Sequence, residues 1–254
     1  MVRLTANIFD LVNTLIKTPS YTASIGKQSA RETKGFESTV RVTYDSLVES
    51  GIKTDWQSFF NKYMIIRDEQ LQSQKQTLKE YNMNERVAGT LTALGLKISA
   101  DSESVKKAID CHFNSYETYV EVDSEAFSLL QQLHLRYKLG LITNFAYPPT
   151  IYNLLEKFHL RQFFDEITIS GEVGWIKPSP RIFQIALSAL QLKANECVFI
   201  GDEIEADVRG ARGVGMKTIL LSKRDVDCPD ADAIVHDLAE LPSAISDIQD
   251  RETV

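Results

Sequence analysis

The chain has 254 residues, of which 43% are hydrophobic and 25% are charged, a balance typical of a globular protein. Its formal net charge of -7 would on average repel a nucleic-acid backbone, and no basic run offsets that charge, so we expect no nucleic-acid partner. No apolar stretch approaches the roughly 18 residues that a membrane span needs, so we expect no membrane partner either.

The first predicted strand is a short apolar run that ends directly before Asp10. Residues 17–122 then show long helical periodicities and no convincing strand. Helix start signals support this reading: a capping box at Thr54–Gln57 and N-caps at Asn84 and Asp101. The aromatic side chains of this block are predicted mainly to form the buried seam of a helical bundle, although a few could line a substrate cleft.

From residue 123 onward, short apolar strands alternate with amphipathic helices. This alternation predicts parallel βαβ units whose helices cover both faces of one sheet. The strand before Asp10 belongs to the same sheet, so the helical block is an insertion after the first strand. The later strands are predicted at 139–142, 166–169, 197–200, 217–221 and 233–235. The helices between them are predicted to begin near Asp123, Pro149, Ser179, Glu203 and Leu238.

Polar residues that could bind phosphate or a metal ion follow the first two of these strands. Asp10 ends the first, and the strand at 139–142 leads into Thr143 and Asn144. Open parallel sheets bind their ligands at this edge. Taken alone, Asp10 could equally be a turn former or a helix cap, and the hydroxyl of Thr143 is a weak signal of phosphoryl binding.

A lysine and an acidic cluster follow later strands. Lys177 precedes a proline that can open a helix, so its ammonium and the helix N-terminus would both attract an anion. Asp202, Glu203, Glu205 and Asp207 come directly after Gly201 and an apolar strand. Carboxylates clustered there repel one another unless a cation compensates, which favours a divalent metal ion. The alternative is a helix N-terminus decorated with acids to match its dipole.

Taken in order, these motifs resemble those of the haloacid dehalogenase-like hydrolase superfamily, in its aspartate-nucleophile phosphatase branch with a helical cap. The resemblance covers nearly the whole chain, and it is specific because all four motifs occur in the family's order. It implies an α/β fold: a Rossmann-like doubly wound parallel sheet core, residues 1–16 and 123–254, with an inserted all-α cap domain, residues 17–122. The motifs are Asp10-x-x-x-Thr14, Thr143, Lys177-Pro178 and Gly201-Asp202-x-x-x-x-Asp207.

The resemblance also implies catalytic roles. Asp10 would be the nucleophile that forms an aspartyl-phosphate, which divides hydrolysis into two easier steps. Thr143 would donate a hydrogen bond to the transferring phosphoryl group, and Asn144 would help to bind the substrate. Lys177 would orient Asp10 and neutralise charge on the phosphoryl oxygens.

By the same resemblance, the cofactor would be Mg²⁺. The ion would be held by Asp10, the backbone carbonyl of Val12 and Asp202, with Asp207 or Glu203 completing the set. It would offset the repulsion between an anionic nucleophile and an anionic substrate.

Val12 departs from the phosphatase pattern. The family's phosphatases carry a second aspartate at this position, which protonates the leaving oxygen, and a valine cannot transfer a proton. General acid–base help is worth about 10² to 10⁴ in rate. The resemblance therefore implies a hydrolase that acts on a small phosphorylated metabolite. Because of Val12, we expect this hydrolase to be slow or to be selective for substrates with good leaving groups.

Two other functions remain open. A core that has lost its general acid could serve as a ligand-binding or protein-interaction module. A 2-haloacid dehalogenase-like hydrolase also lacks that aspartate, but the acidic cluster disfavours this metal-free chemistry. The three cysteines are widely spaced and form no metal-binding pair, which indicates reduced thiols and a cytoplasmic location. The sequence does not indicate an oligomeric state.

Overall fold

The structure is a computed structural model that describes residues 3–18 and 30–251. The chain divides into two compact units. We call the first the α/β unit (Met1–Lys17 and Val122–Val254) and the second the helical unit (Thr18–Glu121). The chain segments that connect them pair as a two-stranded sheet, β2 (Ile16–Lys17) with β3 (Glu121–Val122).

The α/β unit is built on a six-stranded sheet in which each strand is parallel to its neighbours. Its strands are β1 (Ala6–Phe9), β4 (Lys138–Thr143), β5 (Glu166–Ile169), β6 (Cys197–Gly201), β7 (Lys217–Leu221) and β8 (Ala233–Val235). The spatial order is β5-β4-β1-β6-β7-β8. The chain starts in the middle, extends the sheet on one side, and then returns to extend the other side. The predicted doubly wound parallel sheet is therefore confirmed.

The strand register aligns the ends of the three central strands. Phe9, the last residue of β1, pairs with Leu141 of β4 on one side and with Ile200 of β6 on the other. The winding direction reverses between β1 and β6, and open sheets bind ligands at such a switch point, outside the carboxyl ends of the strands. The residues that follow β1 and β6 are Asp10 and Asp202.

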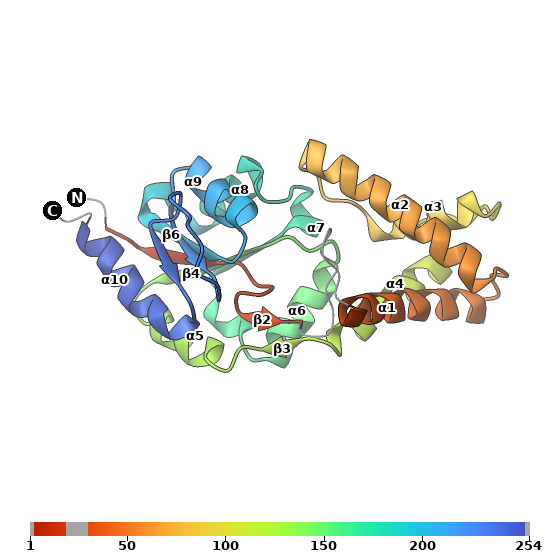
Figure 1. Cartoon of the computed structure of the whole chain (residues 1–254), viewed down its shortest axis with the longest axis horizontal. Helices are drawn as coiled ribbons and strands as arrows, with labels where there is room; N and C mark the ends of the chain where they lie inside the picture. The colour runs from red at the N-terminus through yellow and green to blue at the C-terminus, as the bar shows by residue number, and fades with distance from the viewer. Residues whose placement is uncertain (1–2, 19–29, 252–254) are drawn as a thin grey trace. The chain divides into compact units, whose positions relative to one another are not determined.

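Helices and short turns connect the strands (Figure 1). Four of the five predicted starts lie within one residue of an observed helix or turn. The helix predicted near Asp123 begins instead at Ala126, because Asp123 first forms a turn in which its carbonyl accepts from the Ala126 N–H. The helices are α5 (Ala126–His134), α6 (Pro148–Lys157), α7 (Ser170–Val173), α8 (Pro180–Leu190), α9 (Gly210–Gly213) and α10 (Leu241–Arg251). The shorter turns are η1 (Arg161–Phe163), η2 (Ala194–Glu196), the π-helical η3 (Ile204–Arg209) and η4 (Leu238–Glu240).

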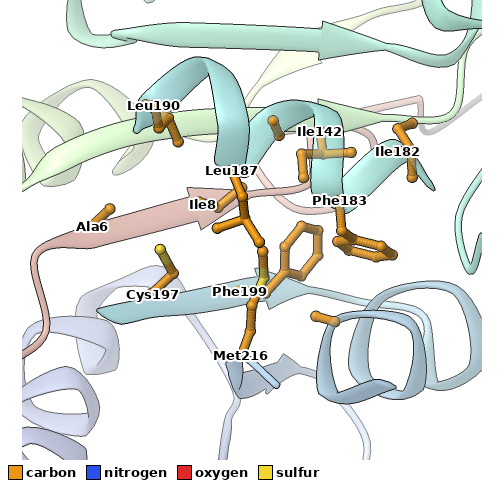
Figure 2. Packing of buried hydrophobic residues seen from close by; sticks show 12 residues of the cluster. Ala6, Ile8, Ile142, Ile182, Phe183, Leu187, Leu190, Cys197, Phe199 and Met216 are labelled. Carbon is orange, nitrogen blue, oxygen red and sulfur yellow. The ribbon is translucent and has the colours of Figure 1, made fainter. Parts of the chain in front are cut away.

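One apolar cluster joins α8 to the central strands (Figure 2). Phe183 of α8 meets Phe199 of β6 edge to face, with ring centroids 5.4 Å apart. The strands leave little room beneath the helix: a Cβ at Gly140 would lie 3.1 Å from Leu190 and 3.2 Å from Ile8. Burial of each large apolar side chain contributes about 1.5–3 kcal/mol to the stability of the fold. This packing therefore holds α8 against the strands that carry the site residues.

The helical unit contains α1 (Ala30–Glu49), α2 (Trp56–Thr77), α3 (Met83–Ala93) and α4 (Glu103–Glu117), and α1 packs along α4. Phe59 and Tyr63 of α2 are fully buried, as the predicted aromatic seam requires. No helix in the part of the chain that the structure describes is long and apolar enough to cross a bilayer.

The N-caps of three helices in this unit differ from the predicted ones. Asp55, not Thr54, caps α2, because its carboxylate accepts from the Ser58 N–H at 2.9 Å, while the Thr54 carbonyl accepts from the Tyr44 hydroxyl. Asn82 and Ser102 cap α3 and α4, in place of the predicted Asn84 and Asp101.

Candidate active site

Strand β1 delivers Asp10 to the carboxyl edge of the sheet. The Asp10 N–H donates to the Ile200 carbonyl at 2.8 Å, which continues the pairing of β1 with β6 by one residue. Thr14, in the loop that follows, donates from Oγ1 to Asp10 Oδ2 at 3.4 Å. Asp10 as a whole is only 7% exposed, and these contacts and Lys177 fix the orientation of its carboxylate.

Lys177 is a buried cation between two carboxylates. Its Nζ lies 2.6 Å from Asp10 Oδ1 and 2.7 Å from Asp207 Oδ1. Burial opposes the charge of this ammonium, but Asp10 and Asp207 outweigh that effect and raise the Lys177 pKa above its usual value. Lys177 is therefore protonated, and it holds Asp10 by a charge-assisted hydrogen bond.

Asp207 reaches this position because Gly201 has no side chain. A Cβ at Gly201 would lie 2.2 Å from Asp207 Oδ2, closer than any real contact. The same oxygen accepts from the Glu203 N–H at 3.0 Å. Asp207 belongs to η3, whose wide turn places its carboxylate inward and 1% exposed.

Three carboxylates converge at the switch point. Asp10, Asp202 and Asp207 each offer an oxygen within 4.8 Å of the others. Burial raises the pKa of Asp10 to about 7, with Lys177 opposing and Asp207 adding to the shift. Burial, followed by Asp10 and Asp207, raises the pKa of Asp202 to about 8. One ammonium against three carboxylates leaves an excess of negative charge, so the donor set fits a hard divalent cation that prefers oxygen ligands.

Two other predicted metal-site residues lie differently. Glu203 is exposed, and it bonds Asp207 through its backbone: its N–H donates to Asp207 Oδ2 at 3.0 Å, and its carbonyl accepts from the Asp207 N–H at 2.9 Å. Val12 is half-buried and forms an isolated β-bridge with Ile16. A role of the Val12 carbonyl in metal binding stays a prediction.

Thr143 ends β4 with a hydroxyl that is buried and has no hydrogen-bond partner among the described residues. Buried polar atoms are rarely left unpaired, and an unpaired donor at the carboxyl edge of the sheet is available to a phosphoryl oxygen. Asn144 follows it, but its amide is engaged with the backbone of Lys177. Oδ1 accepts from the Lys177 N–H at 2.7 Å, and Nδ2 donates to the Lys177 carbonyl at 3.1 Å.

Most of the chain matches the model of a known protein family. The family model described as haloacid dehalogenase-like hydrolase matches residues 7–221. The chain belongs to this family. The structure is similar to that of a 2-haloacid dehalogenase from Pseudomonas syringae, with a TM-score of 0.64 and 21% identity over 96% of this chain and 99% of the other, which shows a common fold.

Two relatives of this hydrolase have names that specify a reaction. The glyceraldehyde 3-phosphate phosphatase of Pyrococcus furiosus is 27% identical over 86% of this chain and 81% of its own. The ribulose-1,5-bisphosphate 5-phosphatase of Halopiger xanaduensis is 28% identical over 85% of this chain and 84% of its own. The chain is thus a haloacid dehalogenase-like hydrolase whose relatives are named as phosphatases.

Proposed function

We propose that this hydrolase is a Mg²⁺-dependent phosphatase that cleaves a small phosphorylated metabolite through an aspartyl-phosphate on Asp10. The observation that carries the proposal is a pair of buried ion pairs, in which Lys177 bonds both Asp10 and Asp207. The carboxylate of Asp202 lies close to those of Asp10 and Asp207. Such an arrangement holds a carboxylate in place for attack and leaves an excess of negative charge for a cation to offset.

Asp10 would act as the nucleophile. One of its carboxylate oxygens attacks phosphorus, and the new O–P bond forms as the bond to the leaving oxygen breaks. The leaving group departs as an oxyanion, which takes a proton from water to give the alcohol. Water then attacks the phosphorus of the aspartyl-phosphate, which releases inorganic phosphate and restores Asp10. Lys177 favours the ionised form of Asp10 and stays close enough to neutralise charge on the phosphoryl group.

Asp10, Asp202 and Asp207 would hold Mg²⁺, which when bound supplies positive charge that draws the phosphate to the nucleophile. Thr143 would donate its unpaired hydroxyl to a phosphoryl oxygen. Asn144, in this proposal, positions Lys177 rather than the substrate, because both ends of its amide bond the Lys177 backbone.

The substrate class we propose is a small phosphorylated sugar or a similar metabolite, as the names of the two relatives suggest. Val12 offers no proton to the leaving oxygen. We therefore expect slow turnover of alkyl phosphates, whose alkoxide needs a proton, and faster turnover of acyl or aryl phosphates.

The test is phosphate release from p-nitrophenyl phosphate, acetyl phosphate and glyceraldehyde 3-phosphate, with Mg²⁺ and with EDTA. We expect Mg²⁺-dependent release that Asp10→Asn abolishes and that Asp247→Asn, an exposed change on α10, leaves intact. Mg²⁺ binding without any phosphate release would contradict the proposal and favour a binding module. Halide release from a 2-haloacid in EDTA would instead favour a dehalogenase.

A further inference from the structure

The helical unit buries an arginine that has no anionic partner among the residues the structure describes. Arg86, in the first turn of α3, is only 3% exposed. Its hydrogen-bond partners among the described residues are uncharged: Nε donates to Gln70 Oε1 at 2.7 Å, and Nη1 donates to the Tyr63 hydroxyl at 3.4 Å. The Tyr81 hydroxyl is a further uncharged partner. Nη2 is buried and makes no hydrogen bond with any described residue.

The aromatic rings around Arg86 compensate its charge only in part. The guanidinium carbon lies 4.2 Å from the ring centroid of Tyr81 and 5.6 Å from that of Tyr63. A cation–π contact stabilises a cation by less than the cost of removing its charge from water. These contacts and the hydrogen bonds to uncharged groups therefore leave the guanidinium without a negative partner among the described residues.

The charge of Arg86 also affects the pKa of a second buried side chain, His112. His112 of α4 is buried, and its Nδ1 lies 2.9 Å from the Thr43 hydroxyl. Burial, and then the charge of Arg86, lower the pKa of His112 to about 3, so its ring is neutral. Arg86 is thus the positive centre of a buried polar group that also contains Tyr63, Gln70 and His112.

We propose that Arg86 is the anchor of an anion-binding site inside the helical unit, which takes a small oxyanion, either a carboxylate or a phosphate group. A guanidinium binds such groups by charge-assisted hydrogen bonds, and Nη2, which has no partner among the described residues, is the donor left for that purpose. A bound oxyanion supplies the negative charge that would pair with the Arg86 guanidinium. The site lies wholly within the helical unit and shares no residue with the carboxylate cluster of the α/β unit.

Tyr81 covers the guanidinium and controls access to it. This residue lies in the short segment between α2 and α3, and it is half-buried, whereas Arg86 is buried. Its ring is the one closer to the guanidinium, so an entering anion requires this ring to move. The half-buried Gln70 borders the guanidinium through its bond to Nε and can remain in place.

The test uses the full chain in EDTA, with His112 as the reporter. The ring resonances of His112 are followed by NMR as sodium sulfate or sodium acetate is added, against sodium chloride at equal ionic strength. We expect a saturable shift with at least one oxyanion. Arg86→Gln should abolish the shift, and Arg41→Gln, an exposed arginine already paired with Asp45, should preserve it. Equal, unsaturable shifts with all three salts would overturn the proposal.

Two further variants keep the test decisive if Arg86→Gln does not fold. Arg86→Lys keeps the charge but loses the planar fork, so we expect binding about tenfold weaker. Tyr81→Ala removes the covering ring, so we expect faster exchange between the free and bound His112 signals. If both variants bind the oxyanion with the affinity and exchange rate of the unmodified chain, Arg86 is not the anchor.

Discussion

Val12 is the residue that most restricts the proposed chemistry. Replacing it by aspartate would supply a carboxyl group two residues after Asp10, able to protonate a leaving oxygen. We expect Val12→Asp to raise kcat for glyceraldehyde 3-phosphate by about tenfold or more, and to raise kcat for p-nitrophenyl phosphate much less, since nitrophenolate leaves without a proton. Steady-state kinetics on both substrates check this. Equal gains would mean that a missing general acid is not what limits turnover.

Gly201 is required by the position of Asp207. A Cβ at residue 201 would lie within 2.7 Å of three Asp207 side-chain atoms, so Gly201→Ala must displace that carboxylate from Lys177. We expect loss of most activity and a lower melting temperature, since displacement leaves a buried charge underpaired. Gly213→Ala on α9 is the matched control, because a Cβ there meets no atom within 4 Å. Full activity in Gly201→Ala would show that Asp207 is dispensable.

The order of motifs in the sequence singled out Asp10, Lys177 and Asp207, and the structure brings their side chains together. The two bonds from Asn144 to the backbone of Lys177 could not be foreseen. They join residues 33 positions apart, and they depend on how the loops after β4 and before α8 lie against each other. An asparagine after a strand is compatible with many partners, and the sequence alone does not select among them.

Helix α4 carries a buried histidine whose protonation opposes folding. His112 titrates near 6.5 when unfolded, but its pKa in the fold is about 3. Below pH 6.5 the unfolded chain binds a proton that the folded chain does not, so the free energy of unfolding falls as pH falls towards 3. The slope approaches about 1.4 kcal/mol per pH unit. His112→Gln should lose less stability than the unmodified chain between pH 7 and 5.

Urea unfolding at several pH values measures this difference, with His236→Gln as the control. His236 is exposed and lies in the α/β unit, so its replacement removes a histidine without changing the buried one of α4. If His112→Gln and the unmodified chain lose stability equally on acidification, His112 is not neutral in the folded helical unit.

The strands were more predictable than the helix ends. All six strands of the main sheet were located from sequence. In an α/β protein, a short apolar run bounded by polar residues is typical of a buried strand. The caps of α2, α3 and α4 each lie a residue or two from the predicted position. Several capping residues stand side by side at these starts, as in Ser99, Asp101 and Ser102, and only the backbone geometry decides which one accepts the bond.

The two tryptophans of the chain lie in different units, Trp56 in the helical unit and Trp175 in the α/β unit. Each single-tryptophan variant, Trp56→Phe or Trp175→Phe, therefore reports the unfolding of one unit by fluorescence. Mg²⁺ bound to the carboxylate cluster would stabilise the α/β unit by about 2.7 kcal/mol at a hundred times its Kd. We expect the transition seen by Trp175 to move to higher temperature with Mg²⁺.

Asp202→Asn identifies where that stabilisation originates. This change removes one of three carboxylates but leaves the bonds of Lys177 to Asp10 and Asp207. Without Mg²⁺, the variant should be at least as stable as the unmodified chain, because burial and neighbouring carboxylates oppose the charge of Asp202. With Mg²⁺, it should lose most of the shift seen by Trp175. A shift of undiminished size would place the cation elsewhere in the molecule, and the excess of negative charge at the switch point would need another explanation.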